Sequence, residues 1–344
     1  SWGSTFLDSP FAKYCVYIHN TTMNSLELCA GAGGQALGLE RAGFNHVNLV
    51  EIDAAACATL RANRPQWQVT EGDLTQFSAT NYLGVDLVAG GVPCPPFSKA
   101  GKQLGADDER NLFPEAIRVV DEARPNAMIL ENVRGLLDPL FAQYRESLSQ
   151  QLALLGYWSG WHLLNSADYG VSQLRPRVVF VALKRELAAH FYWPAPVMRL
   201  PPTVGELLRD LMSENGWKGA QMWAKRANAI APTLVGGSKK HGGPDLGPTR
   251  ARAAWQALGV DGRGLVDTSP APDFVGMPRL TVRMCARVQG FPDDWAFVGK
   301  KTPAYRQVGN AFPPPVAMAV GSAVADALNA DARAKFHATS LVAA

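Results

Sequence analysis

Short apolar runs alternate with helical patterns over the first half of the chain. Strands are predicted where apolar residues follow one another, at residues 26–29, 47–50, 67–71, 86–89, 127–130 and 178–183. Helical spacing follows the first strand through Leu37, Leu39 and Ala42, and it follows the second strand over residues 54–62. Strands that alternate with helices are typical of a parallel sheet with crossover connections, so we expect an α/β fold.

The pattern changes after about Phe191. Pro and Gly become frequent, Trp residues are scattered, and residues 236–247 contain five Gly. This composition predicts an irregular second domain with long loops. Regular structure is expected again at residues 279–289 and in a helix-like run at 316–328. We therefore predict a larger domain and a smaller one, with boundaries at residues 23–190 plus 299–344 and at residues 191–298.

The composition is that of an ordinary globular protein, with 344 residues, a mass of 37.0 kDa and 47% hydrophobic residues. No apolar run approaches the length of about 20 residues that is needed to cross a bilayer. We therefore expect no membrane span and a cytoplasmic location. Residues 1–22 follow no periodic pattern and Met23 directly precedes the first strand, so we treat 1–22 as an N-terminal extension that need not be native.

Cysteine spacing and charge exclude some classes of function and leave others open. The five Cys are scattered without a Cys-x-x-Cys pair, so neither a structural metal nor a disulfide framework is expected. The net charge of +3 is too small to predict a polyanionic partner. Residues 217–266, however, carry eight Lys or Arg against two Asp. A solvated basic face explains such a cluster as well as phosphate contacts do.

A small-residue turn at positions 30–34 follows the first predicted strand, and acidic residues follow the next two. Glu51 ends the second strand and Asp73 the third, which is the general arrangement of a nucleoside-cofactor site. Glu51 would accept hydrogen bonds from ribose hydroxyls, and Asp73 would accept from an adenine amino group. The spacing of Gly31, Gly33 and Gly34 does not match Gly-x-Gly-x-x-Gly, which disfavours dinucleotide binding and a NAD-type oxidoreductase.

Cys94 is held between Pro93 and Pro95, just after the fourth predicted strand. Each Pro ring fixes its own φ and restricts the residue before it, so the loop is stiff. A stiff loop at the carboxyl end of a strand suits a nucleophile that must meet one atom. A buried Cys in a turn is the alternative interpretation, because short motifs match by accident.

Eight blocks together make the chain resemble the DNA cytosine C5 methyltransferases, and the resemblance covers residues 26–328. In order along the chain they are Leu-Cys-Ala-Gly-Ala-Gly-Gly at 28–34, Glu51, Gly-Asp-Leu at 72–74, Pro-Cys-Pro-Pro-Phe-Ser at 93–98, Glu-Asn-Val at 131–133, Gln-Leu-Arg-Pro-Arg at 173–177, Arg-Leu-Thr-Val-Arg at 279–283 running to Gln-Gly-Phe-Pro-Asp at 289–293, and Gln-Val-Gly-Asn-Ala at 307–311. Any single block is a weak signal, but eight in this order are hard to obtain by chance. The resemblance implies a Rossmann-like sheet that uses S-adenosylmethionine, with a smaller target-recognition domain at 191–298.

The implied chemistry explains the residue types. Cytosine C5 is not nucleophilic, so a thiolate, here Cys94, first adds at C6 and turns C5 into an enamine carbon that can take a methyl group. Glu131, expected at the end of the fifth strand, would contact N3 and the exocyclic amine and donate a proton to N3. By resemblance Arg177 holds the target base or its phosphate, and Arg175 supports the cysteine loop. Their spacing of two would place both on one face of a strand.

The cofactor residues carry over from the family by position. The implied set is Leu28, Ala30, Gly31, Gly33, Glu51, Ile52, Asp73, Leu74, Pro93, Leu112, Asn310 and Ala311. Three positions depart from the family pattern: Cys29 stands where Phe is usual, Pro95 where Gln is common, and Met284 where Glu is frequent. We interpret Cys29 as a packing residue.

The target base must rotate out of the duplex to be methylated, and the loop at 97–111 is placed to close over it. The segment at 217–266 then becomes the candidate target-recognition region. Its Thr233-Leu234 pair resembles a short Thr-Leu motif of the family. Candidate DNA contacts from both regions are Ser98, Lys99, Lys102, Arg110, Thr233, Leu234, Lys239, Lys240, Arg250 and Arg252.

The sequence therefore predicts a monomeric enzyme that methylates cytosine in a short sequence of double-stranded DNA, with a cognate restriction endonuclease acting separately. A tRNA cytosine C5 methyltransferase is a close alternative. About 90 residues separate Phe191 from Leu280, which is long for the compact recognition region of that enzyme and favours DNA. A catalytically silent DNA-binding relative is a second alternative, disfavoured by the intact Cys94 and Glu131.

Overall fold

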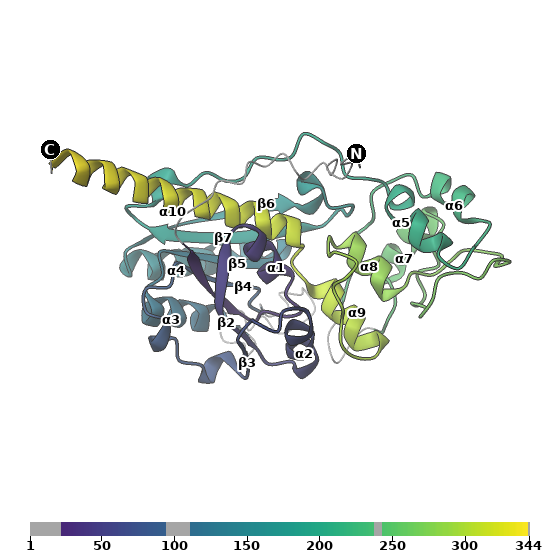
Figure 1. Cartoon of the computed structure of the whole chain (residues 1–344), viewed down its shortest axis with the longest axis horizontal. Helices are drawn as coiled ribbons and strands as arrows, with labels where there is room; N and C mark the ends of the chain where they lie inside the picture. Colours follow the sequence, from purple (N-terminus) through teal and green to yellow (C-terminus); the bar gives the residue numbers. More distant parts are fainter. Residues whose placement is uncertain (1–21, 94–110, 237–242, 343–344) are drawn as a thin grey trace, which may run out of the picture.

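The computed structural model describes residues 22–93, 111–236 and 243–342, with side chains up to residue 331. Its centre is a seven-stranded sheet with the strand order β3-β2-β1-β4-β5-β7-β6 (Figure 1). The strands are β1 (Met23–Leu28), β2 (Phe44–Glu51), β3 (Val69–Glu71), β4 (Leu87–Gly90), β5 (Ala127–Val133), β6 (Tyr157–Asn165) and β7 (Pro176–Lys184).

Strands β1 to β5 are parallel, as the alternating pattern predicts, whereas β7 runs antiparallel between β5 and β6. All six predicted strands are present. The prediction missed β6, whose sequence mixes aromatic, polar and Gly residues. The expectation that Glu131 ends the fifth strand is wrong, because the ladder with β7 continues two residues further, to the pair of Val133 with Arg177.

Helices cover both faces of the sheet. The main ones are α1 (Gly34–Arg41), α2 (Ala54–Asn63), α3 (Phe113–Ala123), α4 (Ala142–Leu154) and α10 (Pro314–Val342). On one face Met128 and Phe180 pack in a cluster with apolar residues of α3 and α4. On the other face Ile129 and Val181 pack with α1 and α10. The arrangement confirms a doubly wound α/β core.

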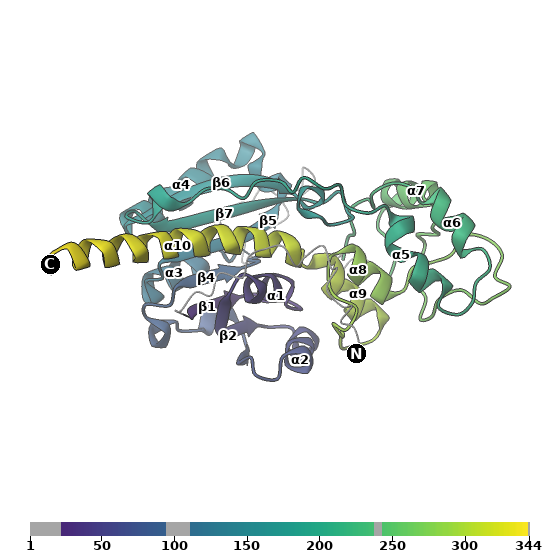
Figure 2. The ribbon, with the colours of Figure 1, turned by 45° about the horizontal axis from the view of Figure 1, so that its top comes forward.

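Helix α10 lies along the sheet and then projects past its edge (Figure 2). The stretch Lys301–Asp331 is long and apolar enough to span a membrane by length and composition. More than half of its apolar window, 56%, is buried inside the protein, which is the pattern of a core helix.

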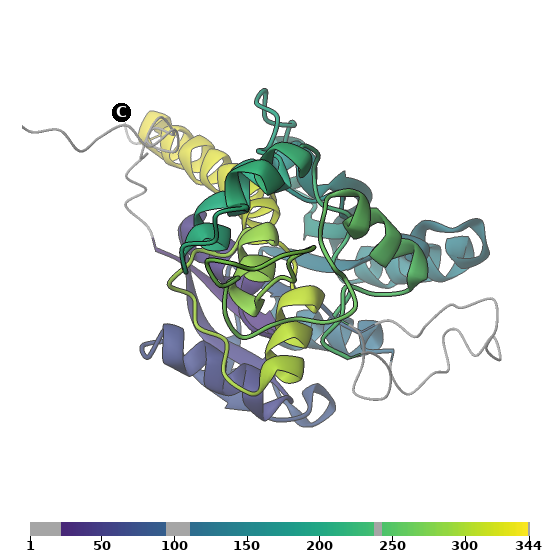
Figure 3. The ribbon, with the colours of Figure 1, turned by 90° about the vertical axis from the view of Figure 1, so that its right-hand side faces the viewer.

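A smaller helical unit lies beside the sheet, at the opposite end of the molecule from the tip of α10 (Figures 1 and 3). It contains α5 (Val204–Ser213), α6 (Ala220–Arg226), α7 (Thr249–Ala257) and α8 (Val282–Val288), and α9 (Lys301–Asn310) leads back to α10. The region is thus less irregular than its Pro and Gly content predicts. Buried residues of this unit and of α2 share one apolar cluster, so the two parts pack together.

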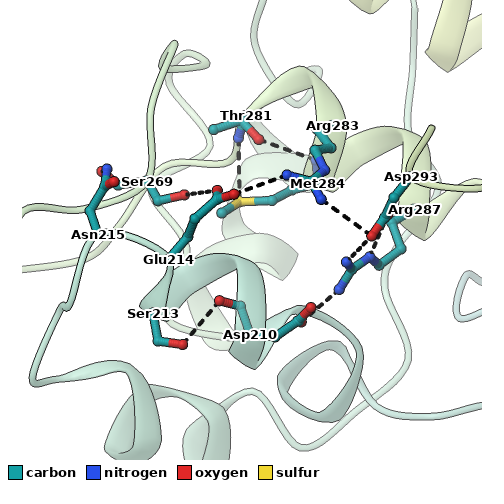
Figure 4. Close-up of polar contacts among 10 residues, drawn as sticks. All are labelled: Asp210, Ser213, Glu214, Asn215, Ser269, Thr281, Arg283, Met284, Arg287 and Asp293. Carbon is teal, nitrogen blue, oxygen red and sulfur yellow. Dashed lines mark hydrogen bonds and ion pairs between the residues drawn. The ribbon is translucent and has the colours of Figure 1, made fainter. Parts of the chain in front are cut away.

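Charged side chains join α5 to α8 on the surface of this unit (Figure 4). Arg287 bonds Asp210 and Asp293, and it also donates to the carbonyl of Leu207. Arg283 bonds Glu214 and lies 3.5 Å from Asp293. Both Arg lie on one side of α8, because they are one turn apart.

Candidate functional site

A cavity of about 300 Å³ opens at the carboxyl ends of the parallel strands. It brings together every cofactor residue predicted from the resemblance except Leu28 and Gly33, and it adds Glu131. Leu28 is fully buried in the core cluster that contains α3 and α4. Gly33 is the residue that precedes α1. Leu28 and Gly33 therefore support the neighbouring turn residues without lining the cavity themselves.

The glycine turn needs its glycines for conformational reasons. Gly31 and Gly33 have φ values of 55° and 85°, a left-handed region that side chains disfavour. A Cβ on Gly33 would lie 2.8 Å from Leu60 Cδ2, and 3.0 Å from Trp295 Cζ2. Trp295 also donates a hydrogen bond from Nε1 to the carbonyl of Ala32, so the indole fixes the outer side of the turn.

Polar groups at the ends of β2 and β3 mark one end of the cavity. The Glu51 carboxylate accepts hydrogen bonds of 2.7 Å from the main-chain N–H groups of Gly31 and Asp53. These bonds fix the carboxylate, while each oxygen keeps a lone pair for a ligand. Two apolar side chains also line the cavity. Ile52 is 67% exposed, whereas Leu74 is only 3% exposed and is held by the surrounding core.

This lining fits the adenosine part of a nucleoside cofactor. The cavity provides an anchored carboxylate for ribose hydroxyls, the Asp73 carboxylate for an exocyclic amine, and apolar side chains for a flat ring. Pro93, Leu112 and Asn310 close the other side.

Glu131 and Arg177 form a buried ion pair beside this cavity. Arg177 Nε lies 2.7 Å from Glu131 Oε1, and both side chains are nearly buried. Burial raises the pKa of the Glu131 carboxyl above its ordinary value, and the charges of Arg177 and Arg175 act in the opposite direction. A carboxyl with a raised pKa is suited to donating a proton near neutral pH.

Arg175 has a different position from the one that its spacing predicts. It precedes β7 and is 0% exposed, and its guanidinium donates to the carbonyls of Leu234, Gly309 and Ala311 at 2.7, 2.7 and 3.1 Å. The side chain therefore ties the Thr233–Leu234 segment to the chain between α9 and α10.

The candidate DNA contacts divide into three groups. Arg250 is exposed on α7 and Arg252 is half-buried there, while the Thr233 hydroxyl donates to the carbonyl of Leu174. Leu234 is 1% exposed, and its side chain packs in the core of the smaller unit, which explains its apolar character. The remaining candidates lie outside the described residues, as do the proposed nucleophile and its unusual neighbour: Ser98, Lys99, Lys102, Arg110, Lys239, Lys240, Cys94 and Pro95.

Two departures from the family pattern have local explanations. Cys29 borders the cavity at a φ of 50°, and burial together with nearby carboxylates raises the pKa of its thiol to about 12. Such a thiol is not a nucleophile at neutral pH, in keeping with a packing role. Met284 is buried at the start of α8, where its sulfur lies 3.5 Å from the main-chain nitrogen of Thr281.

The sequence reasoning missed several cavity residues. Glu27 and Gln35 border the cavity from β1 and α1, and Arg306 borders it from α9. The available signal for Glu27 was an acidic residue between Leu26 and Leu28, since buried strands of parallel sheets are normally apolar.

Residues 23–326 match the family model of the C-5 cytosine-specific DNA methylases. The chain is 62% identical over 306 residues to the type II methyltransferase M.NgoMIV of Neisseria gonorrhoeae, covering 88% of this chain and 97% of that one. It is 54% identical to M.NaeI of Lentzea aerocolonigenes, covering 92% and 78%.

The fold also resembles solved structures. A prophage-encoded protein of E. coli, described as a DNA modification methyltransferase, superposes with a TM-score of 0.64 at 24% identity, covering 89% of this chain and 99% of that one. The S. pombe Dnmt2 methyltransferase gives 0.60 at 16% identity, with coverage of 89% and 99%. These two show the fold alone. The family match and the sequence relatives establish that the chain belongs to the C-5 cytosine-specific DNA methylases, which transfer a methyl group from S-adenosylmethionine to cytosine in DNA.

Proposed function

We propose that this methylase modifies C5 of a cytosine within a short, specific sequence of double-stranded DNA, on a base flipped out of the helix and through covalent addition of Cys94 to C6. One observation supports this most directly. The cavity that fits a nucleoside cofactor also reaches Glu131 and Pro93, the last described residue before Cys94. Cofactor and target base can therefore meet at one edge of the sheet.

The proposed reaction assigns a step to each group. The Cys94 thiolate forms a bond to C6 while Glu131 donates a proton to N3, which moves electron density to C5. S-adenosylmethionine supplies the methyl group, on a sulfonium that C5 attacks. Loss of the C5 proton to solvent, departure of the thiolate and return of the N3 proton to Glu131 then restore a neutral aromatic ring. Arg177 keeps Glu131 oriented, since its Nε lies 2.7 Å from Oε1 of the carboxyl.

The smaller unit is proposed to read the DNA. Arg250 and Arg252 lie on the same helix, α7. Thr233 directly precedes Leu234, whose carbonyl accepts a hydrogen bond from Arg175. The domain boundaries at residues 191 and 298, the monomeric state, the cytoplasmic location and a restriction endonuclease that acts separately all belong to this proposal. The names of the relatives, type II methyltransferases, support the restriction-modification setting.

The nucleophile is tested with Cys94→Ala, and Cys57→Ala on α2 serves as the matched control. We expect Cys94→Ala to abolish methyl transfer while DNA binding persists, and Cys57→Ala to retain activity. DNA that contains 5-fluorocytosine should form a stable covalent adduct with the unmodified enzyme, because fluorine cannot leave as the proton does. Substantial turnover by Cys94→Ala, or the absence of an adduct in the presence of cofactor, would overturn the mechanism.

The substrate is tested by offering double-stranded DNA, single-stranded DNA and tRNA to the enzyme in parallel. Methylation of duplex DNA alone is the expected result, and bisulfite sequencing of DNA from expressing cells then reveals the recognition sequence. Preferential methylation of tRNA would establish the alternative substrate. Binding to DNA without methylation of any of the three would establish a silent relative.

A further inference from the structure

Trp295 reaches the glycine turn from the side that faces away from the cofactor cavity. It lies between α8 and α9 and is 5% exposed, and its Nε1 donates a hydrogen bond of 3.1 Å to the carbonyl of Ala32. Ala32 lines the cavity, whereas Trp295 is not among the described residues that line it. The indole therefore acts on a bound ligand through the turn and not by direct contact.

The turn needs support because of its two glycines. Gly31 and Gly33 flank Ala32, and a glycine has more accessible backbone conformations than any other residue. The N–H of Gly31 must nevertheless point at Glu51 Oε2, 2.7 Å away, to hold that carboxylate in place. A bond to Ala32 restricts the turn at its middle, between the two flexible positions.

The Ala32 carbonyl depends on the indole for its donor. Helix α1 begins at Gly34, and its first bond runs from the N–H of Leu37 to the carbonyl of Gly33. Within the described residues no main-chain N–H donates to the carbonyl of Ala32. A buried carbonyl that loses its donor raises the free energy of that conformation, so without the indole N–H the turn would favour other shapes.

The indole is held in turn by α1 and α2. The guanidinium carbon of Arg64 lies 5.2 Å from the centre of the Trp295 ring, and the same guanidinium bonds both carboxylate oxygens of Glu40 on α1. The main chain of Ala296 exchanges two hydrogen bonds with the side chain of Asn63 on α2, at 2.8 and 2.7 Å. These contacts fix Trp295 relative to the two helices that follow the glycine turn and Glu51.

The segment that carries Trp295 is also tied to the smaller unit. Asp293, two residues earlier, accepts a hydrogen bond of 2.8 Å from Arg287 Nε on α8 (Figure 4). The ring of Phe291 lies 6.0 Å from that of Trp295. Trp295 thus extends from the end of the smaller unit to the turn that borders the cofactor.

We propose that Trp295 is a positioning residue for the cofactor, and that its bond to Ala32 keeps the glycine turn in the shape that binds S-adenosylmethionine. The indole contacts neither the sulfonium nor the cytosine in this assignment. Its loss therefore raises the concentration of cofactor that the enzyme needs and leaves the transfer step unchanged once the cofactor is bound. The inference rests on the cofactor assignment, and it does not depend on the role of Cys94.

Trp295→Phe tests the bond, because it keeps an aromatic ring and removes the N–H. We expect the Kd of S-adenosylhomocysteine, measured by calorimetry, to rise about 5- to 10-fold, the equivalent of one net hydrogen bond. The KM for S-adenosylmethionine should rise by a similar factor, while kcat at saturating cofactor stays within about 2-fold. Affinity for DNA should also stay within about 2-fold.

Trp223→Phe is the matched control. Trp223 lies on α6, is 6% exposed, and donates from Nε1 to the carbonyl of Gly259 at 3.1 Å. The two variants therefore lose the same kind of buried bond, and urea denaturation should show similar losses of stability. Only Trp295→Phe should weaken cofactor binding, because Trp223 does not contact the glycine turn.

Arg64→Met is a second variant that leaves the indole N–H in place. It removes the cation beside the Trp295 ring, and we expect the Kd of S-adenosylhomocysteine to rise about 2- to 5-fold. This variant decides the matter if Trp295→Phe does not fold, since an unchanged Kd in Arg64→Met would then overturn the proposal.

The outcomes for the two Trp variants are distinct. An unchanged Kd in Trp295→Phe, an equal rise in Kd for Trp295→Phe and Trp223→Phe, or a fall in kcat with an unchanged KM would each overturn the proposal. Failure of the unmodified enzyme to bind S-adenosylhomocysteine would contradict the cofactor cavity itself and this assignment with it. The result for Cys94→Ala concerns the nucleophile alone.

Discussion

Arg177 Nε and Glu131 Oε1 lie 2.7 Å apart across the antiparallel pair of β7 with β5. The two residues are far apart in sequence, and strand pairing brings them together because Arg177 is paired with Val133, two residues beyond Glu131. Residues two apart on a strand point to the same face, so the register alone aligns the guanidinium with the carboxyl.

Replacement of Glu131 by Gln should lower the rate of methyl transfer about 100- to 10,000-fold, the range for loss of a positioned general acid. The amide keeps the shape of the side chain but cannot donate a carboxylic proton. Turnover with radiolabelled cofactor measures the rate, and calorimetry with S-adenosylhomocysteine checks that the cavity is intact. A rate within about threefold of the unmodified enzyme would exclude a proton-donor role.

The rate should also depend on pH through Glu131. The carboxyl must be protonated to act as an acid, so activity falls as pH rises through its pKa, which burial places above the ordinary value. Arg177→Met removes a charge that lowers this pKa, and the alkaline decline should therefore move to higher pH. Profiles of kcat at saturating DNA test the shift, with Arg185→Met, directly after the far end of β7, as control. A decline that moves to lower pH contradicts the assignment.

Two neighbouring glycines should respond differently to Ala. Gly33→Ala combines a φ of 85° with a Cβ 2.8 Å from Leu60, so we expect a loss of about 2 kcal/mol or more in the free energy of unfolding. Gly31→Ala adds a Cβ in open space at a φ of 55° and should cost only about 1 kcal/mol. Urea denaturation measures both variants. Equal losses would mean that the contacts with Leu60 and Trp295 do not constrain the turn.

The charged contacts between α5 and α8 should be unequal in strength. The Arg287 side chain is 17% exposed and bonds two carboxylates and a carbonyl, so Arg287→Met should lower the free energy of unfolding by about 1–2 kcal/mol. Arg283 is 47% exposed, and Arg283→Met should cost less than about 0.5 kcal/mol. Thermal unfolding at low and high salt compares them. The opposite order would contradict the geometry in Figure 4.

Arg175→Met should be the most destabilising of the proposed variants. It removes the guanidinium donor from the buried carbonyls of Leu234 and Gly309, whereas the Ala311 carbonyl keeps its bond from Gln289 Nε2, and we expect a loss of about 3 kcal/mol or more. Arg252→Met on α7 is the matched control, expected within about 0.5 kcal/mol of the unmodified protein. A small change in the free energy of unfolding for Arg175→Met would mean that water donates to these carbonyls in place of the guanidinium.

The sequence predicted the parallel part of the sheet well, because β4 and the first half of β5 are apolar runs and β1 and β2 each end in a short, mostly apolar stretch. Strand β6 could not be predicted in this way, since both of its faces carry mixed residues and its pairing with β7 is a long-range contact. Glu51 and Asp73 were predictable as strand-end carboxylates. The length of β5 was not, because it depends on a partner strand far along the chain.

Side-chain environment was the least predictable level. Leu234 belongs to a block associated with recognition, yet its side chain is in the core, and Arg175 resembles a surface residue by type but is fully buried. Nothing local in the sequence distinguishes these positions from exposed ones. Their burial results from the packing of the smaller unit against the end of the sheet.

The bonds made by Arg175 have a consequence for how such an enzyme can change. Its guanidinium holds Leu234, Gly309 and Ala311 through main-chain carbonyls, which every amino acid possesses. The anchor therefore places little demand on the identity of the residues it holds. If the smaller unit reads DNA as proposed, its exposed positions can change the DNA preference without rebuilding the joint between the two parts.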